Sequence, residues 1–438
     1  MRYKESEAYL ERAEQVIPLG SQTFSKSKTQ FPFGASPYFI ERGKGSKVWD
    51  IDGNQYLDFI NGLTAVTLGY QDEDVDRAVR RQIENGVTFS LSHRLEAEVA
   101  ELIVSMVPCA EMVRFGKNGS DATSGAIRLA RAYTGRDHVV VCGYHGWHDW
   151  YIGSTTRNLG VPEVTKSLTH CFQYNDIASL QAVFDQFQGE VAAVIMEPMN
   201  SVLPAKGFLE EVKAIAHNNN ALLIFDEMVT GFRFANGGAQ AYFGVIPDLA
   251  TLGKGLANGY PLSVVTGRKD IMRLMEDILY SFTYGGETLS LAASKAVLNK
   301  LLHHDVIENI TAKGLEIVKG VKRVIHDLGM LDILSISGHP SWTFLNFNET
   351  GIYSQSVLKT YYMQEIFQRG ILGFGTHNIS YAHTREDIKA LLDVYREVFR
   401  NLKDHIEKKD LMKEIRCEVL TPLFSVRPQS KKSHKGEA

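Results

Sequence analysis

The sequence predicts an α/β protein whose large domain holds a mostly parallel β-sheet between layers of helices. Between about residues 70 and 300, helical patterns alternate with four short, nearly continuous apolar segments, which are HVVVCG (138–143), VAAVIMEP (191–198), ALLIFDE (221–227) and PLSVVTG (261–267). Strands without polar alternation are buried on both faces, as in parallel sheets covered by helices. Ligands of such sheets bind at the carboxyl ends of the strands, so we expect the functional site there.

The first 60 residues (1–60) are predicted to form an N-terminal arm and a small meander. Residues 5–17 place apolar side chains at helical spacing, and Pro18 and Gly20 end this helix. Residues 38–60 contain three alternating segments separated by glycine-containing turns, which is typical of antiparallel strands. The large domain is then expected to span residues 61–300.

A second, α+β domain is predicted over residues 301–425. A helical stretch is followed by the strand candidate SWTFLNF (341–347), a helix near 356–369 and another helix from Glu386 onward. The last segment, 426–438, is short, polar and basic, and such a composition predicts a disordered tail.

Composition and charge exclude several classes of protein. The 438 residues include 47 basic and 51 acidic side chains, so the formal charge of −4 gives no chain-wide positive field for binding nucleic acid. The four cysteines form no CxxC pair, and His145 and His148 have no third ligand candidate nearby, so no metal site is expected. A charged N-terminus and short apolar runs predict neither a signal peptide nor a membrane span, and the expected location is the cytoplasm.

The strongest candidate site combines two acids and a lysine. A buried apolar strand ends at Asp226 and Glu227, and Lys254 follows 28 residues after Asp226 in a loop where Gly253 and Gly255 flank it. Each feature alone could be an exposed loop charge. Together they supply an amine for Schiff-base chemistry and a carboxylate opposite it, which is what pyridoxal 5′-phosphate (PLP) requires to keep its ring nitrogen protonated.

With this pair in view, the sequence resembles the class III, fold-type I PLP-dependent aminotransferases, and most closely the glutamate-1-semialdehyde aminomutase-like branch. The resemblance covers about residues 1–400 and includes, in the family's order, PYFIERGKGSKVWDIDG, RFGKNGSDATSGAIRLARAYTGR, GYHGWHDW, the Asp226 strand end, the Lys254 loop and FTYGGETLSLAA. It implies a PLP-dependent transferase with a seven-stranded sheet. It also implies that the smaller α+β domain combines the C-terminal part with the N-terminal arm.

The resemblance assigns roles around the cofactor ring. Lys254 would bind PLP covalently and move protons, and Asp226 would hold the ring nitrogen. Met228 would pack on one face of the ring and Tyr144 on the other, with His145 supporting that arrangement. Lys254, Asp226 and Tyr144 are therefore the expected catalytic residues.

The phosphate group of PLP is expected at a helix N-terminus. KNGSDAT opens a helical stretch, so Gly119, Ser120 and Asp121 would place backbone donors and a hydroxyl there. The same letters also cap helices for structural reasons alone. In the family a threonine of the neighbouring subunit reaches this phosphate, and Thr283 matches it, which implies a homodimer with shared active sites.

The substrate residues depart from the relatives. The N-terminal loop contains Lys26 and Lys28 where the aminomutase has an arginine, and the late loop offers His377 and Asn378 where relatives have an acid or an arginine. Ornithine- or GABA-type activity is therefore disfavoured. A hydroxylated, sugar-like or phosphate-bearing carbonyl compound would suit these residues, with a small amine as donor.

Three functions remain open at this point. The leading one moves an amino group between an amine donor and an aldehyde or ketone acceptor. The alternative inside the family is glutamate-1-semialdehyde 2,1-aminomutase, which shares the cofactor residues and differs only in the pocket. The alternative from another class is a non-catalytic binding protein on the same fold, and the joint presence of Lys254 and Asp226 argues against it.

Overall fold

A seven-stranded sheet is the centre of the larger lobe in the computed structural model, which describes residues 2–421. Its strands lie in the order β4-β10-β9-β8-β7-β5-β6. They span β4 (Met112–Gly116), β5 (His138–Cys142), β6 (Thr169–Cys171), β7 (Val191–Met196), β8 (Leu222–Glu227), β9 (Leu249–Leu252) and β10 (Ser263–Gly267). Only β10 runs antiparallel to its neighbours, so the predicted mostly parallel sheet is confirmed.

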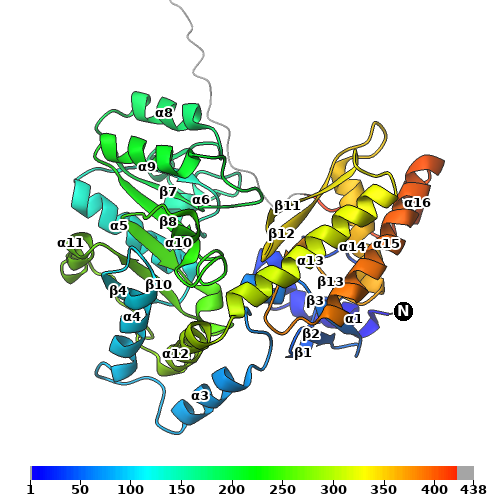
Figure 1. The fold of residues 1–438 in the computed structure, drawn as a ribbon, viewed down its shortest axis with the longest axis horizontal. Helices are drawn as coiled ribbons and strands as arrows, with labels where there is room; N and C mark the ends of the chain where they lie inside the picture. Colours follow the sequence, from blue (N-terminus) through cyan, green and yellow to red (C-terminus); the bar gives the residue numbers. More distant parts are fainter. Residues whose placement is uncertain (1, 422–438) are drawn as a thin grey trace, which may run out of the picture.

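Helices cover both faces of this sheet. All six residues of β7 and of β8 are buried. The apolar sequences of β7 and of residues 222–225 predict this burial, and the two acids at the end of β8, Asp226 and Glu227, are buried with them. One face packs against α5 (Gly119–Thr134), and the other packs against α8 (Ile177–Gln186) and α9 (Phe208–Asn218). The two apolar clusters hold the carboxyl ends of β7 and β8 side by side, and this is where the predicted site lies (Figure 1).

The remaining helices connect and enclose these layers. They are α1 (Lys4–Glu14), α2 (Asn61–Thr64), α3 (Glu73–Ile83), α4 (Arg94–Met106), α6 (Asp149–Ile152), α7 (Glu163–Lys166), α10 (Gly238–Phe243), α11 (Lys269–Met272), α12 (Thr288–His303), α13 (Val306–Asp327), α14 (Gln355–Gln368), α15 (Arg385–Lys408) and α16 (Leu411–Glu414). Four short 3₁₀ turns complete the described part, η1 (Pro18–Gly20), η2 (Phe24–Lys26), η3 (Lys254–Ala257) and η4 (Arg273–Glu276). Among residues 2–421, no helix is long and apolar enough to cross a membrane.

The smaller lobe joins the two ends of the chain. One sheet has the order β1-β2-β3-β13, and a second has the order β11-β12-β14. Their strands are β1 (Ile40–Lys44), β2 (Lys47–Asp50), β3 (Gln55–Asp58), β11 (Leu334–His339), β12 (Trp342–Phe347), β13 (Ile371–Leu372) and β14 (Thr376–Asn378). The first three strands form the predicted antiparallel meander. Because β13 pairs with β3, the C-terminal part and the N-terminal arm share one sheet, as the resemblance implied.

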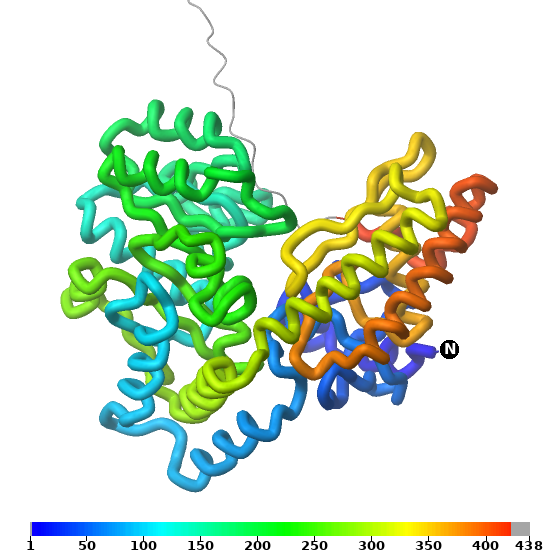
Figure 2. Tube along the Cα trace, in the orientation of Figure 1, coloured from blue at the N-terminus to red at the C-terminus, as the bar shows by residue number. Residues whose placement is uncertain are grey.

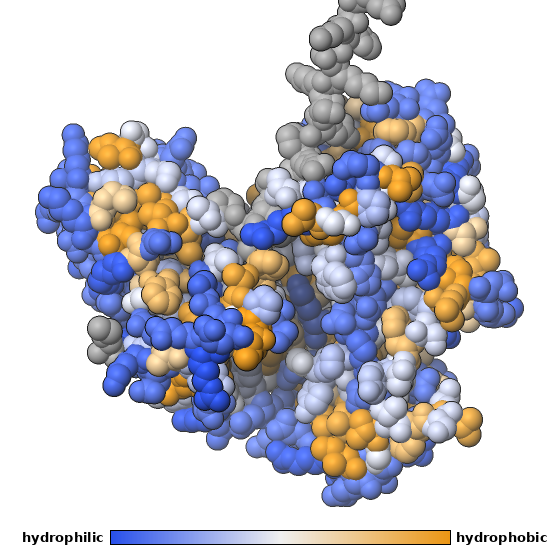
Figure 3. All heavy atoms as spheres, turned by 180° about the vertical axis from the view of Figure 1, so that it is seen from behind, coloured by the Kyte–Doolittle hydropathy of each residue, from blue (hydrophilic) through white to orange (hydrophobic). Residues whose placement is uncertain are grey.

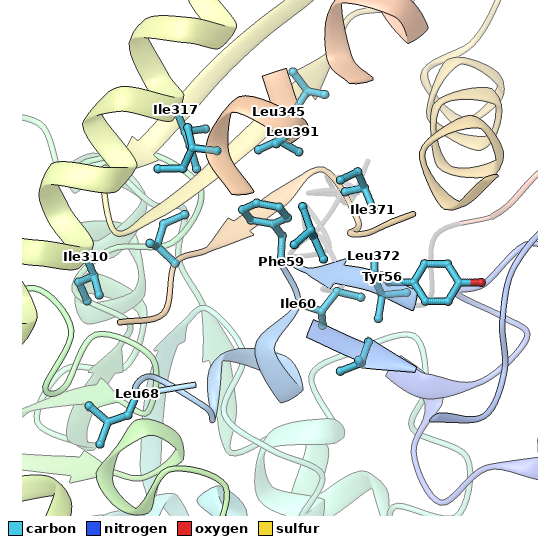
Figure 4. Close-up of a cluster of buried hydrophobic side chains, with 14 of the residues drawn as sticks. Tyr56, Phe59, Ile60, Leu68, Ile310, Ile317, Leu345, Ile371, Leu372 and Leu391 are labelled. Carbon is cyan, nitrogen blue, oxygen red and sulfur yellow. The ribbon is translucent and has the colours of Figure 1, made fainter. Parts of the chain in front are cut away.

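The pictures show the same division. The N-terminal segment lies beside the C-terminal helices in the tube view (Figure 2), and the view from behind shows two lobes with a hollow between them (Figure 3). Figure 4 shows side chains from both ends of the chain in one cluster, among them Tyr56, Phe59, Ile60, Ile371, Leu372 and Leu391.

We propose a domain boundary at residues 304–305, between α12 and α13, close to the predicted one. The tail predicted for 426–438 lies outside the described residues.

Gly314 of α13 lies close to the turn between β11 and β12. A Cβ at Gly314 would lie 1.8 Å from the carbonyl oxygen of Pro340. We expect Gly314→Ala to destabilise the protein by about 2 kcal/mol, since forced overpacking outweighs alanine's better helix propensity. Urea unfolding measures this loss. Gly320→Ala on the same helix is the control, because its Cβ would meet only the movable end of Leu392, and an equal loss in both variants would contradict the prediction.

Candidate active site

A cavity of about 340 Å³ lies at the carboxyl ends of the central strands. Seven of the nine predicted cofactor residues line it, namely Gly119, Ser120, Tyr144, His145, Asp226, Met228 and Lys254. They come from the start of α5, the loop after β5, the end of β8 and the turn after β9. The fold therefore brings together residues that are more than 100 positions apart in the sequence.

Asp226 is fixed in place by three hydrogen bonds. His145 lies with Nδ1 2.7 Å from Oδ2 of the carboxylate, while the Thr251 hydroxyl and the Met228 backbone N–H both donate to Oδ1 over 3.2 Å. The side chains of Asp226 and His145 are almost completely buried. Support of the Tyr144 stacking by His145 stays a prediction, whereas in the structure the His145 ring orients the Asp226 carboxylate.

Lys254 sits in a strained turn at the end of β9. Its φ of 46° is in the left-handed region, where non-glycine residues are uncommon and are held by their surroundings. Burial lowers the pKa of Lys254, Glu197 and Asp226 act to raise it, and Arg233 acts to lower it. A lowered pKa makes the amine a better nucleophile at neutral pH.

Steric crowding explains why glycine occupies the positions on both sides of Lys254. A Cβ at Gly253 would lie 2.6 Å from the sulfur of Met228, and a Cβ at Gly255 would lie 2.5 Å from the Thr67 hydroxyl. Since both distances are shorter than real Cβ contacts, close packing demands glycine at these two positions.

The start of α5 forms one wall of the cavity. Gly119 and Ser120 are the first two residues of the helix, and no hydrogen bond to their backbone N–H groups occurs among residues 2–421. The carboxylate of Asp121 is already hydrogen-bonded, because it accepts from the backbone N–H groups of Lys117 at 3.1 Å and Asn118 at 2.7 Å. Asp121 caps the helix and does not line the cavity, so its predicted contact with the phosphate group is not supported.

Tyr144 lies at the opening of the cavity and is 51% exposed. Its ring makes an edge contact with Tyr151 at 5.7 Å between centroids, and burial of its inner part raises its pKa. Met228 lines the same cavity beside Gly119. Stacking of Tyr144 and Met228 on two faces of a ring remains a prediction.

Glu197 is a site residue that the sequence reasoning missed. It follows β7, lines the cavity and accepts a hydrogen bond from the Tyr144 backbone N–H at 3.2 Å. Burial, and then the charge of Asp226, raise its pKa to about 7. The position directly after a buried strand, which singled out Asp226, would also have found Glu197.

The raised pKa of Glu197 gives a pH prediction for the protein freed of cofactor. The folded state keeps this proton up to about pH 7, whereas the unfolded chain releases it near 4.5, so stability falls as pH rises between these values. Between pH 5 and 7.5 we expect wild-type protein to lose about 2 kcal/mol more unfolding free energy than Glu197→Gln. Urea unfolding at both pH values measures the difference, and equal pH dependence in the two proteins would contradict it.

Other predicted residues lie outside the cavity. Thr283 lines a separate cavity of about 630 Å³ together with residues 88–92, 280–282, 285 and 286. Lys28 forms an ion pair with Glu14 at 2.5 Å, and Lys26 ends the η2 turn; neither lines the Lys254 cavity. His148 bonds to Ser124 at 2.6 Å, and no metal-binding group of His, Cys, Asp or Glu occurs among the described residues.

The two late-loop residues are in the core. His377 bonds to the Thr343 hydroxyl at 2.9 Å and to the Tyr395 hydroxyl at 2.8 Å, and burial lowers its pKa to about 3. Asn378 donates to the carbonyl oxygen of Ile60 at 2.7 Å. Because both side chains are held inside the smaller lobe, their predicted contact with substrate is not supported.

Comparison with known proteins agrees with this geometry. A family model described as aminotransferase class-III matches residues 31–336. The chain belongs to the class-III aminotransferase family. This class-III aminotransferase is 32% identical to 3-aminobutyryl-CoA aminotransferase of Cloacimonas acidaminovorans, over 92% of this chain and 98% of that protein. It is 38% identical to glutamate-1-semialdehyde 2,1-aminomutase of Methanothrix thermoacetophila, over 77% and 81% of the two chains.

Solved structures extend the match to the fold and the cofactor. The FumI protein of Sphingopyxis sp. MTA144, solved in a form that carries PLP, is 27% identical with a TM-score of 0.86, over 92% of this chain and 98% of that one. The class-III aminotransferase is a PLP-dependent enzyme with the fold-type I architecture. Its curated relatives are named for an aminotransferase and for an aminomutase, so the reaction family is common to them while the substrate is not.

Proposed function

We propose that this enzyme moves an amino group between a small amine donor and an aldehyde or ketone acceptor, with Lys254 as the residue that holds PLP covalently. One observation carries the proposal: the buried amine of Lys254 and the fixed carboxylate of Asp226 line the same cavity. A non-catalytic binding protein would not need a strained lysine with a lowered pKa at this place.

The residues of the cavity fit PLP. The free N–H groups at the start of α5 suit its phosphate, because a helix N-terminus attracts anions. The Asp226 carboxylate, oriented by His145, would keep a proton on the ring nitrogen. When bound, PLP supplies an electron sink for the reacting carbon. The Lys254 amine would take a proton from that carbon and return it at the second carbon, on the other side of the amino nitrogen, while Met228 and Tyr144 would enclose the ring.

For the acceptor we propose a hydroxylated, sugar-like carbonyl compound. Among residues 2–421, the lysines that line the cavity are Lys117 and Lys254, and no arginine lines it. A paired guanidinium fork for a substrate carboxylate is therefore not built into this wall, whereas polar groups such as Tyr144 and Tyr260 are present. Lys26 remains a proposed contact from the N-terminal loop, and Lys28 would first have to leave Glu14.

Half-reaction screening tests this proposal. Candidate amines are offered to the PLP form, and candidate carbonyl compounds are then offered to the pyridoxamine form, with the absorbance change reporting each step. We expect turnover with a hydroxylated carbonyl acceptor and slow or no conversion of glutamate-1-semialdehyde to 5-aminolevulinate. Efficient 5-aminolevulinate formation would instead favour the aminomutase.

We also propose a cytoplasmic homodimer with shared active sites. All four cysteines are free thiols, which suits a reducing compartment. Leu91, which lines the Thr283 cavity, is 85% exposed, and Leu279, which lies next to the lining residue Tyr280, is 82% exposed. Exposed apolar residues of this kind favour a protein partner, and Figure 3 shows several apolar patches on one face.

The shared site predicts the effect of a substitution outside the Lys254 cavity. We expect Thr283→Ala to weaken PLP retention about tenfold, because one hydroxyl contact to the phosphate in the partner's site is lost. Gel filtration of the holoenzyme followed by absorbance measurement reports the retained PLP. Thr283→Ser is the control that keeps the hydroxyl, and full retention in the alanine variant would refute the contact.

A further inference from the structure

One strand–helix unit supplies the cavity wall that is proposed to receive the phosphate, and it also holds the loop that carries Thr283. The unit consists of β4, Lys117, Asn118 and α5, and it places Gly119 and Ser120 in the cavity wall. The loop spans residues 281–286, between Tyr280 and Glu287, and its residues other than Tyr284 line the separate cavity described above. Both ends of this loop are attached to the same unit.

The first end is attached through Tyr280. Its buried ring lies so close to the unit that a Cβ at Gly116 would be 2.6 Å from the Tyr280 hydroxyl oxygen, and one at Gly125 would be 2.6 Å from the ring. Arg114 of β4 donates to the carbonyl oxygen of Tyr280 at 3.2 Å. The entry to the loop is thereby seated on β4 and α5.

The second end is attached through an ion pair. Nζ of Lys117 lies 2.9 Å from Oε2 of Glu287, and the side chains are only 15% and 14% exposed. Glu287 also caps α12 by accepting from the Leu289 N–H at 2.6 Å. Burial acts to raise the pKa of Glu287, but hydrogen bonds from Ser290 and Lys117 outweigh it and lower the pKa. The pair is therefore charged, shielded from water and in contact with the cavity wall.

We propose that Lys117 is a positioning residue that couples PLP binding to subunit association. Resting on the proposed function, the coupling works because the cavity wall that receives the phosphate and the loop that would reach the partner are joined by the Lys117–Glu287 ion pair. A movement of the cavity wall would then shift the loop, and a movement of the loop would shift the cavity wall. Coupling of this kind is reciprocal, so PLP tightens the dimer by the factor by which dimerisation tightens PLP binding.

The same helix offers a matched control. Lys300 of α12 pairs with Asp72 at 2.6 Å, with side chains 15% and 8% exposed, so this pair is as shielded as the Lys117 pair; Lys300 also pairs with the more exposed Asp74 at 3.0 Å. Neither Lys300 nor Asp72 lines the Lys254 cavity or the Thr283 cavity. Lys300→Met removes the comparable ion pair with Asp72, together with the more exposed one with Asp74, without touching the proposed connection.

The experiment measures the subunit dissociation constant by sedimentation, with and without bound PLP, in full-length wild type, Lys117→Met, Glu287→Gln and Lys300→Met. We expect PLP to tighten the wild-type and Lys300→Met dimers by about tenfold or more. In Lys117→Met and Glu287→Gln this factor should fall below about twofold, and Lys117→Arg should restore it. Glu287→Gln keeps an oxygen to cap α12, so it remains informative if Lys117→Met does not fold.

The results separate this inference from the proposed function. An unchanged factor in Lys117→Met and Glu287→Gln, or an equal fall in Lys300→Met, would overturn the coupling. Wild-type protein that binds PLP but associates equally with and without it would overturn the coupling alone. Wild-type protein that binds no PLP would overturn the proposed function as well, and absorbance of the sedimenting species shows which case holds.

Discussion

Replacing Lys254 by alanine is expected to abolish amino-group transfer, with a fall of at least about a thousandfold in turnover. The amine has two tasks in the proposed reaction, since it holds PLP and moves the proton, and among the described residues Lys117 is the one other lysine that lines this cavity. Steady-state turnover with saturating PLP measures the loss. The variant should still bind PLP without a covalent bond, because Asp226 and the start of α5 are unchanged.

Lys117 also lines the cavity and provides the comparison for Lys254. Lys117→Met removes a basic group from the same wall but leaves the proposed proton-moving amine in place. We therefore expect it to retain turnover far above that of Lys254→Ala once PLP is saturating. Activity of Lys254→Ala within tenfold of wild type would mean that another group moves the proton.

Asp226→Asn is expected to keep PLP bound and to lower turnover by about a hundredfold or more. The amide retains the size of the side chain, but a neutral partner no longer keeps the ring nitrogen protonated. Half-reaction rates at saturating substrate measure the effect, and bound PLP is followed by absorbance. Turnover close to wild type would show that Asp226 is not the partner of the ring nitrogen.

A second buried aspartate controls for damage to the fold. Asp248 is 4% exposed and bonds to His217 at 2.8 Å, much as Asp226 bonds to His145. It precedes β9 and does not line the cavity. Asp248→Asn should therefore lower stability without lowering turnover per folded active site, which separates the electrostatic loss in Asp226→Asn from general destabilisation.

The central strands and the main pair of site residues were predictable because they depend on local patterns. β7 and β8 show no polar alternation, so burial on both faces could be read from their sequences. Asp226 interrupts such a strand at its carboxyl end, and ligands gather at that edge. The helix start at Gly119 was likewise visible, since a polar capping segment precedes a helical pattern.

Residues whose importance depends on neighbouring strands were not predictable from the same patterns. The place of Glu197 directly after β7 was visible in the sequence, but its raised pKa, caused first by burial and then by the charge of Asp226, depends on a strand order that the sequence does not give. His377 looked like a polar loop residue, but Thr343 and Tyr395 satisfy its ring nitrogens in the core. Polar groups can be buried when partners from distant elements satisfy them, and a single segment does not show those partners.

The central claim is that Lys254 is the residue that holds PLP in the cavity beside Asp226. The most direct test treats purified holoenzyme with borohydride, digests it and locates the added mass of the reduced cofactor by peptide mass mapping. The account predicts a single modified peptide that contains Lys254. Modification at a different lysine, or none in protein that contains PLP, would contradict it.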